Sequence, residues 1–277
     1  MKAKKSLGQN FLTSIPARIA IVNAGNLTSS DTVLEIGPGK GFLTKALLDT
    51  GAQIIALEKD RELLPILNEQ FSNYENFTLI EGDALTFDMS FPRRRESRLI
   101  TLDPRLREDD TNNKLIVPYK LIANIPYYIT GAILSRYLSH THQPTQMVVL
   151  VQQEVAERVV ARDKKESILS LAVKVYGEPK IVYRVKRGSF NPIPNVDSAV
   201  LSIDNISRKN FKNTNHEENF FKVLKGGFSH KRKFMISNLK EKLPETNWQE
   251  LFIKNNINEK IRAEDVPLET WLSLSLL

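Results

Sequence analysis

Four short, predominantly apolar segments alternate with stretches of helical periodicity in the first half of the chain. They cover residues 33–36, 54–57, 77–80 and 120–123. Segments of this length and composition are typical of parallel strands that are buried on both faces. Because strands that alternate with helices build parallel sheets, the pattern predicts an α/β domain.

The pattern continues beyond these four segments. Residues 147–151 are all apolar and predict a further strand, whereas residues 132–138 and 153–160 have helical spacing. We expect the last two strands at residues 170–176 and 199–201, as an antiparallel pair that closes the sheet.

Both ends of the chain have helical character. Near the amino terminus, Ile15, Ile19 and Val22 share one face of a predicted helix. From residue 205 onward the apolar positions recur with helical spacing, in residues 220–224, 235–243, 248–253 and 268–272. The sequence therefore predicts an α/β domain over residues 1–204 and a small all-helical domain over residues 205–277.

A glycine-rich loop follows the first predicted strand. It runs from Gly37 through Gly39 to Gly41, and a helical stretch begins at Phe42. Strand, glycine loop and helix form the opening unit of nucleotide-binding α/β domains, in which glycine lets the backbone approach a ligand closely. The dinucleotide fingerprint has the spacing G-x-G-x-x-G, whereas this loop has G-x-G-x-G. Glu35, just before the loop, also fits a cationic ligand better than a pyrophosphate.

Polar side chains stand at the ends of the next three predicted strands. Glu58 follows the second strand, Asp83 the third and Asn124 the fourth. Because open α/β sheets bind ligands at the carboxyl ends of their strands, we expect these residues to converge on one crevice. There Glu58 can accept hydrogen bonds from both hydroxyls of a ribose, and Asp83 can meet an adenine amino group. Each carboxylate taken alone also fits an ordinary solvated loop.

The turn that begins at Asn124 suits a nucleobase amine. Such an amine is a weak nucleophile because its lone pair is delocalised into the ring, so a site that activates it needs acceptors for its N–H groups. Asn124 offers a side-chain carbonyl, and Ile125 offers a backbone carbonyl that Pro126 stiffens. Tyr127 supplies a face for stacking. Taken alone, the same residues also fit an ordinary turn after a strand.

Composition narrows the chemistry further. The 277 residues contain no cysteine, which fits a reducing compartment and removes the nucleophile that methylation at carbon 5 of a pyrimidine needs. The four histidines show no metal-site spacing, so no metal is expected. No apolar stretch approaches the ~20 residues of a membrane span, and we see no signal peptide behind the basic amino terminus.

The net charge favours a polyanionic partner. It is +7 at pH 7, and basic residues cluster ahead of Phe190 and again over residues 231–233. A basic cluster is also what an ordinary solvated face presents, so the charge alone does not establish nucleic-acid binding.

The chain resembles the ribosomal RNA adenine N6,N6-dimethyltransferases over nearly its whole length. The motifs that carry the resemblance are LGQNFL at 7–12, EIGPG at 35–39, Glu58, GDAL at 82–85, NIPY at 124–127, FNPIPNVDS at 190–198 and FSHKRK at 228–233. The resemblance implies a Rossmann-like, class I methyltransferase sheet and S-adenosylmethionine as methyl donor. It also implies a cytoplasmic, monomeric enzyme that dimethylates N6 of two adjacent adenosines near the 3′ end of small-subunit rRNA in the pre-30S particle.

The family also suggests roles for individual residues. It implies that the donor is bound by the residues at Asn10, Leu12, Gly37, Gly39, Glu58, Asp83 and Asn124. In the mechanism that we expect, Asn124 and the Ile125 carbonyl accept the two N6 hydrogens of the target adenine, and Pro126 stiffens the turn. The ring stacks on Tyr127 and is covered on its other face by Phe190. The donor residues form the cofactor-binding set, and the turn with Phe190 forms the catalytic set.

The chain departs from the family pattern in two places. Asp83 and Asn124 are 41 residues apart, and an insert at about residues 92–110 accounts for the excess. The insert nearly balances its acidic and basic residues, which favours a solvated excursion over a phosphate-binding patch. Residues 166–170 stand where many relatives have a Tyr-Gly pair, so the role of that loop in RNA contact is open.

Two other functions remain as alternatives. One is the related group of methyltransferases that modify a single large-subunit rRNA adenosine and confer macrolide resistance, with a similar glycine loop and turn. The other is a non-catalytic RNA-binding assembly factor. The acidic residues at three strand ends argue against the second, because a pure RNA-binding protein does not need donor contacts.

Overall fold

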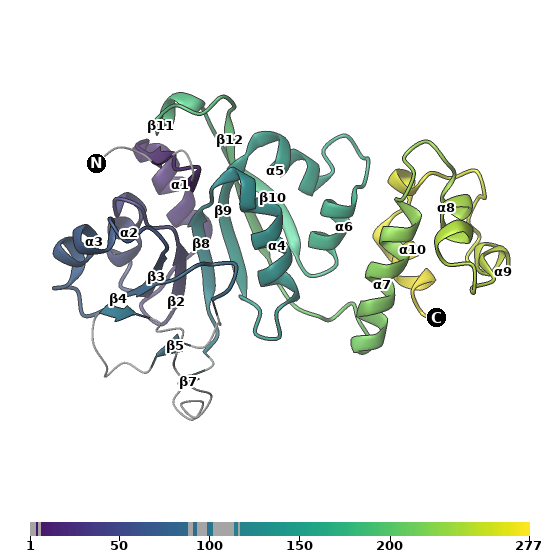
Figure 1. Ribbon diagram of the computed structural model, residues 1–277, viewed down its shortest axis with the longest axis horizontal. Coiled ribbons are helices and arrows are strands. Elements are labelled where there is room, and N and C mark those ends of the chain that lie inside the picture. Colours follow the sequence, from purple (N-terminus) through teal and green to yellow (C-terminus); the bar gives the residue numbers. More distant parts are fainter. Residues whose placement is uncertain (1–3, 5–6, 88–90, 93–98, 102–113, 116) are drawn as a thin grey trace. The chain divides into compact units, whose positions relative to one another are not determined.

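The computed structural model describes residue 4 and residues 7–87, 91–92, 99–101, 114–115 and 117–277 (Figure 1). The chain forms two compact units. The first comprises Met1–Ala156 and Lys180–Ile206, and the second comprises Glu157–Pro179 and Ser207–Leu277. The expected boundary after residue 204 lies close to the observed change at 206. Residues 157–179, which we expected in the first domain, belong instead to the second unit.

An eight-stranded sheet is the centre of the first unit. Its order is β10-β12-β9-β8-β2-β3-β4-β6. The strands are β2 (Thr32–Ile36), β3 (Gln53–Glu58), β4 (Phe77–Glu81), β6 (Leu99–Thr101), β8 (Lys120–Asn124), β9 (Gln146–Gln152), β10 (Glu178–Val185) and β12 (Ser198–Asp204). All five strands predicted between residues 33 and 151 are confirmed.

The strand order changes direction at β2. From β2 the chain adds β3 and β4 on one side, and it later adds β8 and β9 on the other, all as parallel neighbours. Ile36 at the end of β2 is therefore in register with both Leu57 of β3 and Ala123 of β8. Such a switch point leaves a crevice at the carboxyl ends of the central strands.

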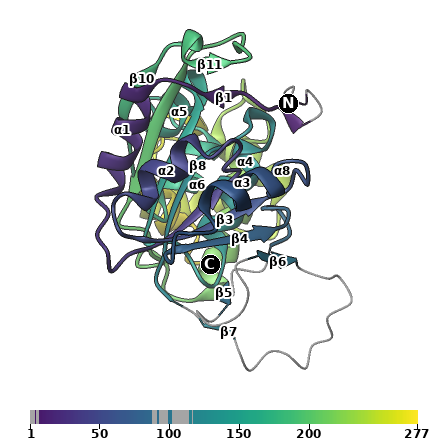
Figure 2. The ribbon, with the colours of Figure 1, turned by 90° about the vertical axis from the view of Figure 1, so that its left-hand side faces the viewer.

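Helices cover both faces of the sheet (Figures 1 and 2). On one face lie α1 (Ile15–Gly25), α2 (Phe42–Leu48) and α3 (Leu64–Phe71), and on the other lie α4 (Thr130–Ser139) and α5 (Gln153–Val160). Two short segments, β1 (Phe11–Leu12) and β11 (Phe190–Asn191), pair antiparallel outside the main sheet. A further short pair joins β5 (Phe91–Pro92) and β7 (Lys114–Leu115).

The helix α1 buries a different face from the one its apolar spacing suggested. Ala17 and Ile21 are fully buried in the core, whereas Ile15 and Ile19 are 56% and 50% exposed. Ser14 caps the amino end of the helix, where its hydroxyl accepts from the Ala17 N–H at 3.4 Å. The helix is apolar on more than one side, so periodicity alone could not select the buried face.

The second unit is helical. It contains α6 (Ile168–Lys174), α7 (Thr214–Gly227), α8 (Met235–Lys242), α9 (Trp248–Lys254) and α10 (Leu268–Leu274). Its core is built on large aromatic side chains that are fully buried, among them Phe220, Trp248, Phe252 and Trp271. A small helical unit of this kind gains most of its stability from such burial.

The strand predicted at residues 170–176 is wrong, because this segment forms the helix α6. Ser167 and Ser170 form a reciprocal capping box at its amino end, with the Ser170 N–H donating to the Ser167 hydroxyl at 3.0 Å. The closing antiparallel pair is made instead by β12 and β9, from Ser198 opposite Gln152 onward.

The α/β sheet and the helical carboxyl-terminal region agree with the predicted fold class. The insert at about residues 92–110 lies almost wholly outside the described residues. Within the described part of the chain, no helix has the length and apolar character that a membrane crossing requires.

Candidate active site

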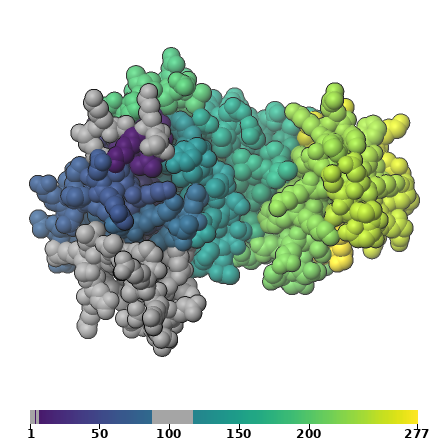
Figure 3. Space-filling view, viewed as in Figure 1, coloured from purple at the N-terminus to yellow at the C-terminus, as the bar shows by residue number. Residues whose placement is uncertain are grey.

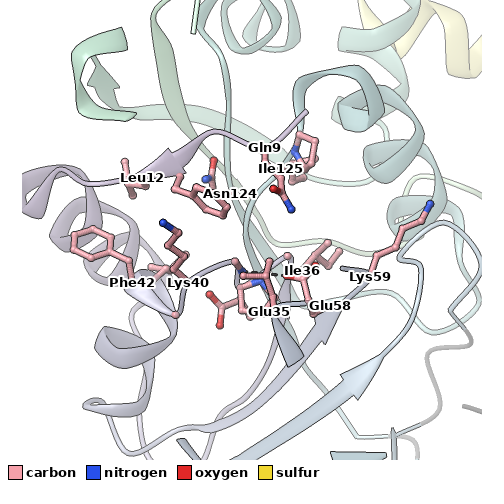
Figure 4. A pocket seen from close by; sticks show the side chains of 18 of the residues that line it. Gln9, Leu12, Glu35, Ile36, Lys40, Phe42, Glu58, Lys59, Asn124 and Ile125 are labelled. Atoms are coloured by element: carbon pink, nitrogen blue, oxygen red, sulfur yellow. Dashed lines mark hydrogen bonds between the residues drawn. The ribbon is translucent and has the colours of Figure 1, made fainter. Parts of the chain in front are cut away.

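A cavity of about 730 Å³ opens at the carboxyl ends of β2, β3 and β8, in the first unit (Figure 4). Its wall comes from the amino-terminal residues 7–13, from the loop and helix at 35–45, from residues 57–59 and 82–84, and from the turn at 124–129. A volume of this size suits a small-molecule ligand.

The amino-terminal segment, residues 7–13, forms a strap along the cavity. Figure 3 shows this purple segment at the surface, between the blue residues after β3 and the green loop around β11. Asp60, which is 4% exposed, anchors it by accepting from the Gln9 amide at 2.8 Å and from the Lys4 ammonium at 2.7 Å. The strap is therefore tied to the loop that follows β3.

The glycine loop needs its glycines for two reasons. Gly37 has a φ of +65°, and a Cβ added there would meet nothing within 4 Å, so the backbone borders open space. Gly41 has a φ of +79°, and a Cβ added there would lie 2.4 Å from the ring of Phe71. The loop can therefore bring backbone close to a ligand on one side while it packs against α3 on the other.

Glu58 joins the end of β3 to the glycine loop. Its Oε2 accepts from the Gly39 N–H at 3.1 Å, and its Oε1 accepts from the Asp60 N–H at 2.8 Å. Burial raises the pKa of Glu58, while these N–H groups act in the opposite direction. Each carboxylate oxygen has more than one lone pair, so Glu58 can still accept from a pair of hydroxyl groups.

Asp83 stands at the end of β4 and is already partnered. Its Oδ2 accepts from the Lys59 ammonium at 2.8 Å, and its Oδ1 accepts from the Leu85 N–H at 2.9 Å. Partial burial opposes ionisation of Asp83, but these two donors outweigh it and hold its pKa below the ordinary value. The group is therefore an anionic acceptor at neutral pH.

Glu35 is the most deeply buried acid of the cavity wall, with 1% of the residue exposed. Its Oε2 has no hydrogen-bond partner among the described residues. Burial raises the pKa of Glu35 to about 8, and the nearby Glu58 carboxylate acts in the same direction. A buried carboxyl that lacks a partner and faces a cavity is suited to a cationic or hydrogen-bond-donating ligand.

The turn after β8 is fixed from both sides. The Asn124 amide nitrogen donates to the Asn10 carbonyl of the strap at 3.0 Å, which leaves the other end of the amide as an acceptor. The Ile125 N–H donates to the Leu150 carbonyl of β9 at 3.3 Å. In Figure 4, Asn124 and Leu12 lie on the opposite side of the cavity from Glu35 and Glu58. The cavity thus places an amide acceptor opposite the acids of β2 and β3.

Tyr127 is held by its hydroxyl group, which is 2.7 Å from the hydroxyl of Ser198. Burial raises the pKa of Tyr127, so its phenol is neutral at physiological pH. With its hydroxyl fixed on β12 and its ring on the cavity wall, the side chain can offer a stacking surface without a charge.

Most of the predicted site residues meet at this cavity. The residues that line it are Asn10, Leu12, Gly37, Gly39, Glu58, Asp83, Asn124, Ile125, Pro126 and Tyr127. Phe190 is the exception, because it is 2% exposed and belongs to the hydrophobic core, where it pairs with Leu12. In this structure Phe190 packs behind the strap, and its expected role against the adenine stays a prediction.

Sequence reasoning missed several residues of the cavity wall, among them Tyr128, Arg18 and Lys40. Tyr128 is 64% exposed, and the second of two adjacent tyrosines was the signal that could have identified it. Arg18 and Lys40 also line the cavity. Among the described residues, no group of three or more His, Cys, Asp or Glu side chains is arranged to hold a metal ion.

Comparison with known proteins gives a consistent result. The family model described as ribosomal RNA adenine dimethylase matches residues 1–277. The ribosomal RNA small subunit methyltransferase A of Dehalococcoides mccartyi (strain CBDB1) is 38% identical over 278 residues, covering 100% of this chain and 88% of the relative.

Two solved structures have the same fold. A dimethyladenosine transferase from Plasmodium falciparum has a TM-score of 0.74 at 25% identity, covering 95% of each chain. The 23S rRNA methyltransferase ErmE has a TM-score of 0.72 at 24% identity, covering 96% of this chain and 98% of its own.

Proposed function

The chain belongs to the ribosomal RNA adenine dimethylase family, and we propose that its cavity holds the methyl donor and a target adenine together. As a member it is an S-adenosylmethionine-dependent rRNA adenine N6,N6-dimethyltransferase. The proposed substrate is a pair of adjacent adenosines near the 3′ end of small-subunit rRNA in the pre-30S particle. We further propose that the enzyme acts as a monomer in the cytoplasm.

The donor half of the cavity fits S-adenosylmethionine. Glu58 retains acceptor capacity for two ribose hydroxyls, and Asp83 is an anionic acceptor for an adenine amino group. The unpartnered Oε2 of Glu35 suits an ammonium group, and the backbone at Gly37 borders open space. When bound, the donor supplies an electrophilic methyl group on a sulfonium.

The acceptor half fits a flipped adenosine. Asn124 and the Ile125 carbonyl accept the two hydrogens of N6, which orients the nitrogen lone pair, while Tyr127 stacks on the ring. Rate enhancement then comes from orientation and electrostatics. No side-chain base is needed, because the methylated ammonium is acidic enough to lose its proton to water. For the second transfer one acceptor has lost its N–H partner, so the two transfers depend differently on Asn124.

The observation that best supports this proposal is the hydrogen bond from the Asn124 amide to the Asn10 carbonyl. It uses the donor end of the amide and so presents the carbonyl end as an acceptor. A site that merely bound RNA would not need a fixed amide acceptor opposite buried acids.

The second unit supports contact with rRNA. Residues 228–233 form a loop that presents the exposed Lys231 and Arg232. The buried amide of Asn238 holds this loop by donating to the Gly227 carbonyl at 2.7 Å and to the His230 carbonyl at 3.1 Å. A fixed pair of cations suits the phosphates of a folded RNA.

The small subunit is favoured over the large one by the level of similarity. The chain is 38% identical to a small-subunit enzyme over its full length, whereas the likeness to the 23S rRNA enzyme is at 24% identity and concerns the fold alone. An antibiotic-susceptibility test separates the two, because large-subunit methylation of this kind confers macrolide resistance.

The central experiment replaces Asn124 with alanine. We expect methyl incorporation into small ribosomal subunits from cells that lack the enzyme to fall about 100-fold, as when one fixed hydrogen-bonding group is lost from an active site. Primer extension should show the stop at two adjacent adenosines with the wild type and not with Asn124→Ala. Asn23→Ala, an exposed asparagine of α1, is the matched control.

Near-normal turnover by a folded Asn124→Ala protein would refute the mechanism. Calorimetry with S-adenosylmethionine separates loss of the donor from loss of the chemical step, because Asn124 also anchors the strap.

A further inference from the structure

Four cationic side chains line the cavity, and two of them are already neutralised. The four are Arg18, Lys40, Lys45 and Lys59. Lys45 pairs with Asp49, which follows the end of α2, and the Lys59 ammonium is 2.8 Å from Asp83. Within the described part of the chain, Arg18 and Lys40 form no ion pair with a carboxylate.

Arg18 is held in place without an acid. Its Nη1 donates to the Phe42 carbonyl at 3.4 Å, and its guanidinium carbon lies 4.4 Å from the centre of the Phe42 ring. Its Nε is buried and has no partner among the described residues. An orphaned buried donor is costly, so an anion that reached it would gain a charge-assisted hydrogen bond.

Lys40 reaches the same part of the cavity from the glycine loop. Its ammonium lies 5.0 Å from the centre of the Phe11 ring in the strap. Figure 4 shows the Lys40 side chain beside Phe42, on the side of the cavity away from Lys59. The two cations therefore lie at the β2–α2 end of the cavity, whereas Asp83 stands at the end of β4.

The chemistry of this end matches the amino-acid end of the donor. S-adenosylmethionine carries its adenine at one end and an α-carboxylate with an ammonium at the other. Asp83 and Glu58 suit the adenosine, and the orphaned Oε2 of Glu35 suits the ammonium. A phosphate of the RNA backbone fits less well, because the Arg18 Nε is buried and Arg18 belongs to the wall of the cavity.

We propose that Arg18 and Lys40 form the subsite for the α-carboxylate of the methyl donor. The proposal rests on the placement of the donor in this cavity. The two side chains bind and orient the donor, and they take no part in the chemistry at N6.

The test is calorimetric titration with S-adenosylmethionine and with its decarboxylated analogue, which differs only in the absent carboxylate. Arg18→Gln and Lys40→Gln should each weaken binding of S-adenosylmethionine about tenfold, as expected for loss of one charge-assisted hydrogen bond. Neither variant should change binding of the decarboxylated analogue. Arg18→Lys should recover part of the lost affinity.

Lys45→Gln is the matched control, because it removes a cation of the same cavity that Asp49 already neutralises. It should leave both affinities unchanged. Lys40 is exposed, so Lys40→Gln carries the test even if replacement of Arg18 impairs folding.

Three results would overturn the inference, and they differ from failure of the proposed function. The first is an equal loss of affinity for both ligands, and the second is no loss for either. The third is lower methylation of subunits with unchanged donor affinity, which would assign the cations to RNA. If the wild-type protein bound neither ligand, the donor placement itself would be wrong.

Discussion

Replacing Glu35 with glutamine should stabilise the first unit in a manner that depends on pH. The Glu35 side chain is buried at the end of β2, with one carboxylate oxygen lacking a partner among the described residues. Burial raises its pKa to about 8, against an ordinary value of 4.5. Glutamine has nearly the same shape but cannot ionise, so the variant removes the titration and keeps the volume.

The sign and size of this effect on stability follow from the difference in proton binding between the folded and unfolded states. Between about pH 4.5 and pH 8 the folded protein keeps a proton on Glu35 that the unfolded chain releases, so the free energy of unfolding falls as pH rises. Each pKa unit is worth about 1.36 kcal/mol. Relative to acid pH, the carboxyl therefore costs about 1 kcal/mol at pH 5 and at most about 5 kcal/mol at pH 9. The stability advantage of Glu35→Gln over the wild type should therefore be about 4 kcal/mol larger at pH 9 than at pH 5.

The two units can be measured separately. Both tryptophans, Trp248 and Trp271, lie in the second unit, so their fluorescence reports urea unfolding of that unit alone. Hydrogen exchange of peptides that cover β2 and β3, measured across a urea series, reports the first unit. The effect of Glu35→Gln should appear in these peptides and grow with pH, while the fluorescence midpoint should not change.

The reasoning would be refuted if the stability difference between wild type and Glu35→Gln were the same at pH 5 and pH 9. Groups that titrate in both proteins cancel in this comparison, so a flat difference would mean that Glu35 has an ordinary pKa. The variant should also bind S-adenosylmethionine more weakly than the wild type at pH 8, because it lacks the anion that we propose for the donor ammonium.

Three further substitutions test packing and the catalytic turn. Gly227→Ala places a Cβ 2.4 Å from the Trp271 ring and should lower the fluorescence-detected stability of the second unit by roughly 1–3 kcal/mol; an unchanged midpoint would contradict the packing. Tyr127→Phe loses the hydrogen bond to Ser198 but keeps the ring, so methyl transfer should stay within a few-fold of wild type, and a 100-fold loss would assign chemistry to the hydroxyl. Ile21→Ala opens a cavity in the core and should destabilise the first unit by about 3 kcal/mol, as measured by hydrogen exchange. A loss under 1 kcal/mol would show that the surrounding side chains fill the cavity.

The parallel strands could be predicted because each is a short apolar run followed by a residue with a special backbone or chemical role. Gly37, Glu58 and Asn124 end three of them, and their positions at one edge of the sheet follow from the parallel arrangement alone. Residues 170–176, most of which lie in α6, were misassigned because their apolar side chains suit a strand as well as a helix. The capping box at Ser167 favours the helix, but an assignment based on apolar runs does not take serines into account.

The side of the cavity formed by the strap depends on contacts between residues far apart in the chain. Asp60 binds Gln9 across 51 positions, and Asn124 binds Asn10 across 114. Neither contact produces a periodic pattern in the sequence, so only the three-dimensional structure shows that the strap is attached to Asp60 and Asn124. Phe190 illustrates the same limit, since an aromatic residue near a predicted site can stack on a ligand or fill the core. In this structure Phe190 pairs with Leu12 and belongs to the hydrophobic core.

These contacts make the two halves of the cavity depend on each other. Asp60 follows Glu58 closely in the chain and fixes Gln9, while the next residue, Asn10, fixes the amide of Asn124. Glu58 in turn accepts from the backbone N–H groups of Asp60 and Gly39. Hydrogen bonds, joined by the peptide bond between Gln9 and Asn10, therefore connect the acids of the donor side to the amide of the acceptor side. Because the path passes through the strap, the position of the strap and the orientation of the Asn124 amide depend on each other.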